Sequence, residues 1–213
     1  MTYGILASQS CLLTKIARAL QEKTKKAYTV DRLSGHLKDG VDAKAVAVYL
    51  NYVRKMVPSE PVVHIDDSDV IKPDGYHFEA LGTVRDGSKS TTKNCVYAKG
   101  YYVIEACVLT DSNHPASIYS RIHSSHEKEF TSVNHITFEA IDRSVKLLKN
   151  STFVIDRGYD DDKIFQKLWE LEQDFVIRLT QKRKLVSINS GPNDQKSRRK
   201  CAAKIRSGCG QIH

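Results

Sequence analysis

Apolar residues in the first quarter of the chain recur every three or four positions, a spacing that predicts short amphipathic helices. Each of the clearest segments follows a residue whose side-chain oxygen can cap a helix: Ser10 before residues 11–22, Thr29 before 30–38, and Asp42 before 43–57. The pattern therefore predicts a small helical unit over residues 1–57.

After Pro58 and Pro61 the pattern changes to one of short apolar runs and two longer amphipathic stretches. Strands are predicted over residues 62–66, 100–110, 116–124, 152–155 and 174–180, and helices over 131–150 and 161–173. The turn-rich residues 72–94 predict an irregular excursion with at most a short hairpin. This order indicates an α/β fold, a mixed sheet flanked by helices over residues 58–180, and it matches the ribonuclease H-like fold.

Two of the predicted strands end on a carboxylate. Asp66 ends the first strand and Asp156 ends the fourth, and in this architecture the two strands lie side by side. Ligand chemistry in open α/β sheets gathers at such strand ends, and converging carboxylates can hold Mg²⁺. Asp67 and Asp69 are interpreted as a solvated turn, with a supporting role behind the metal ligands as the alternative. Residues 160–162 are interpreted as caps of the following helix.

Charge is distributed unevenly along the chain, which carries a net charge of +8. Residues 1–57 contribute +6, residues 58–180 contribute −6 and residues 181–213 contribute +8. A basic segment beside an acidic centre suggests contact with a polyanion, and Lys23, Lys25 and Lys26 are the candidate DNA-binding residues in the helical unit. A small packing module with solvated lysines is the alternative.

The composition indicates where in the cell the protein is expected. No apolar run approaches the roughly 18 residues that a membrane span needs, so we expect no membrane contact. Five widely spaced cysteines indicate reduced thiols in the cytoplasm, not a disulfide framework.

Three stretches together carry a family resemblance: YGILASQSCLLTKIARAL (3–20), HIDDSDVIKPDGYHFEALGTVRDGS (64–88) and FVIDRGYDDDKIF (153–165). With them the chain resembles the DDE-type transposases of bacterial insertion sequences, in the subgroup with a Tyr-Arg-Glu-Lys signature near the third acid. The resemblance implies metal-dependent hydrolysis and strand transfer at transposon ends. Asp66 and Asp156 would be the first two catalytic acids and the ligands of Mg²⁺ or Mn²⁺.

The same resemblance implies the partners. Double-stranded DNA of the transposon ends would be the substrate, with Arg157 and Tyr159 as further DNA contacts, although packing and turn roles suit both residues equally. A nucleoid-associated protein of the bacterial cytoplasm is expected, and a homodimer in a synaptic complex is an assembly consistent with the family.

The end of the chain departs from the family pattern. The family's third acid is a glutamate on a later helix, yet no glutamate follows Glu172, and residues 181–213 show no apolar period. We interpret these residues as an aberrant basic tail, disordered and following a frameshift or truncation, and we expect an inactive fragment. Two alternatives stay open: a nuclease or resolvase of the same fold with Asp160, Glu170 or Glu172 as third acid, and a DNA-binding remnant without catalysis.

Overall fold

The computed structural model describes residues 2–38 and 40–180, and the chain divides into two compact units. The first unit spans residues 1–51 and the second begins at Tyr52, so the boundary falls inside helix α4 (Ala43–Met56). The predicted tail, residues 181–213, lies outside the described residues.

Three short helices precede α4 in the first unit: α1 (Thr2–Ser8), α2 (Leu13–Leu20) and α3 (Lys26–Lys38). Ile16 of α2 and Leu33 of α3 are buried and form the centre of the unit. A Cβ atom at Gly4 of α1 would lie 2.6 Å from Ile16 Cγ2, which is closer than real contacts allow. Glycine at this position therefore permits the approach of α1 to α2.

Of the three predicted helix starts, one is confirmed and two are wrong. α2 begins at Leu13 with Leu12 as its N-cap, so Ser10 does not cap it. The N–H of Lys44 donates to Asp42 Oδ1 at 2.7 Å, so Asp42 caps α4 as predicted. Thr29, in contrast, lies inside α3 and is buried. Its hydroxyl donates to Glu22 Oε2 at 2.9 Å, and Glu22 also pairs with Arg32. Because Glu22 provides this acceptor, Thr29 stabilises the packing of α3 without capping it.

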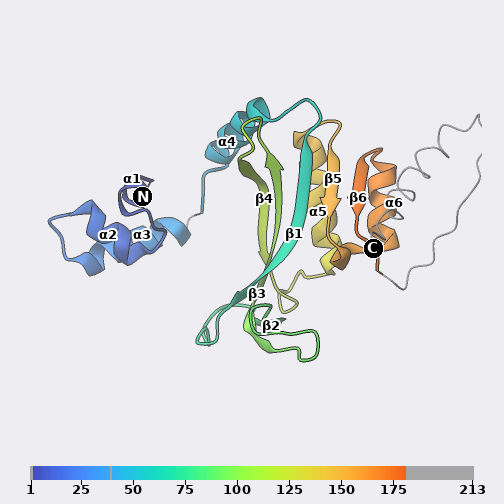
Figure 1. The fold of residues 1–213 in the computed structure, drawn as a ribbon. Helices are drawn as coiled ribbons and strands as arrows, with labels where there is room; N and C mark the ends of the chain where they lie inside the picture. The colour runs from blue at the N-terminus through green and yellow to red at the C-terminus, as the bar shows by residue number, and fades with distance from the viewer. Residues whose placement is uncertain (1, 39, 181–213) are drawn as a thin grey trace, which may run out of the picture. The chain divides into compact units, whose positions relative to one another are not determined.

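Six strands of the second unit form one mixed sheet (Figure 1): β1 (Val62–Ile71), β2 (Gly82–Arg85), β3 (Tyr97–Leu109), β4 (Pro115–His123), β5 (Thr152–Ile155) and β6 (Asp174–Ile177). The order is β2-β3-β1-β5-β6, and β4 also pairs with β3. β1 runs antiparallel to β3 and parallel to β5, and β5 is parallel to β6. The predicted α/β class with a mixed, ribonuclease H-like sheet is confirmed.

β1 is longer than its sequence predicts, because it continues to Ile71 through pairing with β3. β5 pairs only with residues 62–65 of β1, so the remaining part of β1 forms a ribbon with β3 that extends past β5. β2 pairs with residues 97–100 at the far end of this ribbon. The predicted excursion thus contains a real, short antiparallel pairing.

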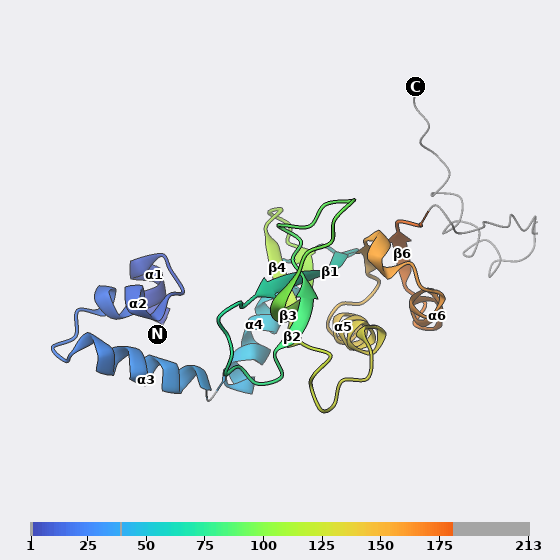
Figure 2. The same ribbon diagram turned by 90° about the horizontal axis from the view of Figure 1, so that it is seen from below.

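Helices α5 (Val133–Leu147) and α6 (Asp162–Glu170) contact each other and lie on the same side of the sheet (Figure 2). The cap of α5 is Ser132, whose hydroxyl accepts the N–H of His135, and the cap of α6 is Asp161, which accepts that of Lys163. On β1 and β5 the buried side chains alternate with exposed ones, and the buried set faces the helices: Val63, Ile65, Phe153 and Ile155.

The opposite face of the sheet, here called the open face, carries the alternate residues of the same strands. His64, Asp66 and Asp156 are exposed there, and Val176 of β6 is 45% exposed. Within residues 52–180, no helix covers this face of β1 and β5. The described part of the second unit is therefore packed on one side only.

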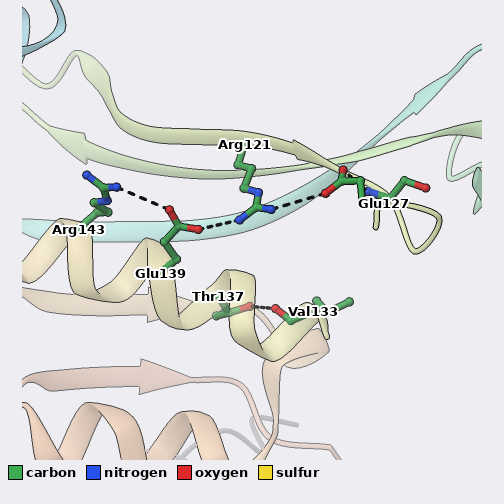
Figure 3. Close-up of polar contacts among 7 residues, drawn as sticks. Arg121, Glu127, Val133, Thr137, Glu139 and Arg143 are labelled. Carbon is green, nitrogen blue, oxygen red and sulfur yellow. Dashed lines mark hydrogen bonds and ion pairs between the residues drawn. The ribbon is translucent and has the colours of Figure 1, made fainter. Parts of the chain in front are cut away.

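A network of ion pairs connects α5 to β4, an edge strand of the sheet (Figure 3). Arg121 of β4 contacts Glu139 of α5 at 2.8 Å and Glu127 of the following loop at 3.5 Å. Glu139 also contacts Arg143 at 3.8 Å, one turn later in α5. The Arg121 side chain is 33% exposed, so part of this network is shielded from solvent and holds β4, its loop and α5 together.

Candidate active site

Asp66 lies in β1, and Asp156 directly follows the neighbouring strand β5. His64 pairs with Val154 and Ile65 with Ile155, so Asp66 and Asp156 each directly follow the last residue of this parallel register. Neighbouring strands are separated by about 4.8 Å, so the two backbones are close at this level. Both side chains are exposed and alternate with the buried Ile65 and Ile155, which puts them on the open face.

A further carboxylate that the sequence did not single out lies on the same face. Glu105 of β3 pairs directly with Asp66 across the antiparallel ladder and is exposed. Burial raises the pKa of the nearby Cys107 thiol, and the charges of Glu105 and Asp66 raise it further. The open face is therefore negatively charged where β3, β1 and β5 meet.

Asp67 points the other way, toward the helix-covered interior. Its carboxylate Oδ1 is buried and lies 3.7 Å from Nε2 of His123, a ring that is itself buried. Burial, and then the Asp67 charge, raise the pKa of the Tyr159 hydroxyl above its ordinary range. The interpretation of Asp67 as part of a solvated turn is wrong, because the continuation of β1 directs every second side chain inward.

The Asp67–His123–Tyr159 group links the two strand ends. Asp67 follows Asp66 directly, and Tyr159 belongs to the 3-10 turn Arg157–Tyr159, whose first hydrogen bond runs from the Tyr159 N–H to the Asp156 carbonyl at 3.1 Å. His123 is held between the rings of Tyr102 and Phe130. The group therefore lies directly beside the backbone of both acids.

The predicted DNA contacts differ in exposure. Arg157 is exposed beside Asp156, whereas Tyr159 is only 6% exposed, which favours its packing role over a DNA contact. Lys23, Lys25 and Lys26 are exposed at the connection of α2 to α3, in the first unit.

The acids considered as alternative third ligands do not join Asp66 and Asp156. Asp160 Oδ2 accepts the N–H of Thr180 at 2.7 Å and its hydroxyl at 2.8 Å. Glu170 ends α6 and Glu172 follows it, and the helix returns toward the opposite end of β5, where Thr152 pairs with Asp174.

Asp66 and Asp156 are hard oxygen donors. Mg²⁺ and Mn²⁺ prefer carboxylate oxygens, and Mg²⁺ is commonly held by one or two carboxylates together with water and substrate phosphate. Asp66 and Asp156 fit that description. Across residues 2–38 and 40–180, no three His, Cys, Asp or Glu side chains converge as a metal site.

A sequence profile of the transposase DDE domain matches residues 59–208, which is most of the chain. The chain belongs to the transposase DDE domain family. No curated protein matches the sequence. DNA is the substrate of this transposase family, and its members generally use divalent metal ions. The matched range includes residues 181–208, outside the described part of the chain.

The transposase domain begins just before β1 and includes every strand of the sheet. In the described part of this transposase, no helix combines the length and the apolar character needed to cross a lipid bilayer.

Proposed function

We propose that Asp66 and Asp156 are the first two catalytic acids of this transposase and bind a divalent metal ion, Mg²⁺ or Mn²⁺. The observation that supports the proposal is the parallel register of β1 and β5, whose last pair, Ile65 and Ile155, directly precedes the two acids. A bound ion would neutralise charge on a DNA phosphate and orient the attacking oxygen.

The remaining residues of the site would position the two carboxylates and the DNA. Asp67, His123 and Tyr159 form a buried group beside the two acids, and its packing would limit the relative movement of the carboxylates. Arg157 is exposed beside Asp156, and its guanidinium suits a contact with a DNA phosphate.

The helical unit would supply sequence-independent affinity for DNA. Residues 1–57 hold a net charge of +6, and Lys23, Lys25 and Lys26 are exposed at one connection. Basic side chains release counterions when they bind phosphates, so this contribution should weaken steeply as salt rises. A cytoplasmic location beside the nucleoid accords with such binding.

We further propose that this chain does not complete DNA hydrolysis and strand transfer. Asp66 and Asp156 supply only part of a metal shell, and no glutamate follows Glu172 in the sequence. A loosened ligand set matters because a misplacement of about 1 Å can cost roughly 100-fold in rate.

A cleavage assay tests this reading against its alternatives. The full chain is incubated with Mg²⁺ or Mn²⁺ and supercoiled plasmid carrying the element's ends, beside the Asp156→Asn variant. Neither protein should nick the DNA. Robust nicking that disappears in the variant would favour the nuclease or resolvase, with its full set of acids inside this chain. DNA binding with no metal affinity at all would favour the non-catalytic remnant.

A further inference from the structure

The pairing of β2 with the start of β3 creates an exposed, basic and aromatic surface. Thr83 pairs with Lys99, and Arg85 pairs with Tyr97. All four side chains are exposed, and they alternate with the buried Val84 and Gly100. These four residues, on one side of a two-stranded ribbon, are called the ribbon face below.

The ribbon face belongs to the same side of the sheet as the two acids. On β3, residues 98, 100, 102, 104 and 106 share the side that includes the buried Ile104 and Ala106. Tyr97, Lys99 and Glu105 therefore share the opposite side, and Glu105 pairs with Asp66. The pairing of β1 with β3 runs without a shift from Val63 to Ile71, so the alternation is preserved along this stretch.

The separation along β3 matches several base pairs of DNA. Lys99 lies six residues before Glu105, and Tyr97 lies eight residues before Glu105. At the rise of a strand these separations correspond to about 20 and 27 Å. Successive base pairs are about 3.4 Å apart, so these lengths equal roughly six to eight base pairs. Figure 1 shows β2 at the end of β3 remote from the turn that leads to β4.

Charge distinguishes this segment from the rest of the second unit. Residues 72–99 contain five Lys or Arg and three acids, a net of +2, within an otherwise acidic stretch. Asp86 is buried, accepts a hydrogen bond from Ser88 and pairs with Lys89. Its charge therefore offsets little of the positive charge on the ribbon face. Lys72 lies beside Lys99, since its N–H donates to the Lys99 carbonyl at 2.8 Å.

We propose that the ribbon face binds the sugar–phosphate backbone of duplex DNA six to eight base pairs from the phosphate held at Asp66 and Asp156. Arg85 and Lys99 contact phosphates, and the Tyr97 ring, 64% exposed, lies against the sugars or donates its hydroxyl to a phosphate. This inference rests on the proposed function, because it takes the two acids as the site of cleavage.

The test compares double variants of equal charge in the full chain. Arg85→Gln with Lys99→Gln removes two charges from the ribbon face. Lys128→Gln with Lys149→Gln removes two from exposed positions before and after α5. Binding to a fluorescein-labelled duplex of about 30 base pairs, without metal, is followed by anisotropy from 50 to 300 mM salt.

We expect the ribbon variant to lower the salt slope by about 1.8, since each phosphate contact contributes about 0.9, and to weaken binding roughly 10-fold or more. The control double variant should change the slope far less, and Arg85→Lys with Lys99→Arg should bind like the wild type. If the ribbon variant behaves like the control, the inference is overturned and the transposase proposal is untouched. If the wild type binds no duplex at all, both fail.

Discussion

The two faces of β5 predict losses of stability of very different size for substitutions at neighbouring residues. Phe153 is fully buried on the helix-covered side, whereas Val154 is half-buried on the open face. Phe153→Ala removes a large ring from a packed core and should cost about 3–5 kcal/mol of unfolding free energy. Val154→Ala removes two partly solvated methyl groups and should cost about 1 kcal/mol or less.

Urea unfolding measures this contrast. Trp169 is the single tryptophan of the chain, and it contacts Phe165 and Phe175, so its fluorescence reports on the second unit. With a denaturant slope near 2 kcal/mol per molar urea, Phe153→Ala should lower the midpoint by about 1.5–2.5 M. Val154→Ala should lower it by about 0.5 M or less. Equal shifts, or a larger shift for Val154, would refute the assignment of the two faces.

Two further outcomes follow from polar contacts of the second unit. Arg121→Gln should cost about 1 kcal/mol in the same urea assay, and Arg143→Gln close to none, since the Arg143 side chain is 65% exposed and makes one longer contact. The Ser88 hydroxyl, first among several donors, lowers the pKa of the Asp86 carboxyl. The resulting stability is present above the unfolded pKa of about 4 and is lost as pH falls through the lower folded value. Asp86→Asn should therefore be less stable than the wild type at pH 7, with the difference shrinking at pH 3.

The order of the elements, and the adjacency of the two strands that precede or carry the acids, could be predicted from the sequence. Apolar runs such as residues 152–155 are buried strands in the structure, and the fold class implied that the first and fourth strands are neighbours. Asp42 caps α4 through a local contact, which local sequence can predict.

Long-range pairing determined the parts that the sequence did not predict. Asp67 and Asp69 have low strand propensity, so the end of β1 resembles a turn until β3 pairs with it. Only that pairing brings Asp67 to His123 and Glu105 to Asp66, because the partners are more than 35 positions apart in sequence. The prediction that Thr29 caps a helix was wrong for another reason: its hydroxyl donates to Glu22, which lies before the start of α3.

The most direct test of the metal site is Mn²⁺ binding, followed by electron paramagnetic resonance. We predict that the wild-type chain binds Mn²⁺ and that Asp66→Asn and Asp156→Asn each weaken binding at least about 10-fold, because each removes a proposed ligand. Asp174→Asn is the control, since Asp174 is an exposed acid that begins β6 at the other end of the sheet. Binding that is absent from the wild type, or equally strong in the Asp66, Asp156 and Asp174 variants, would contradict the assignment of these two acids as the metal ligands.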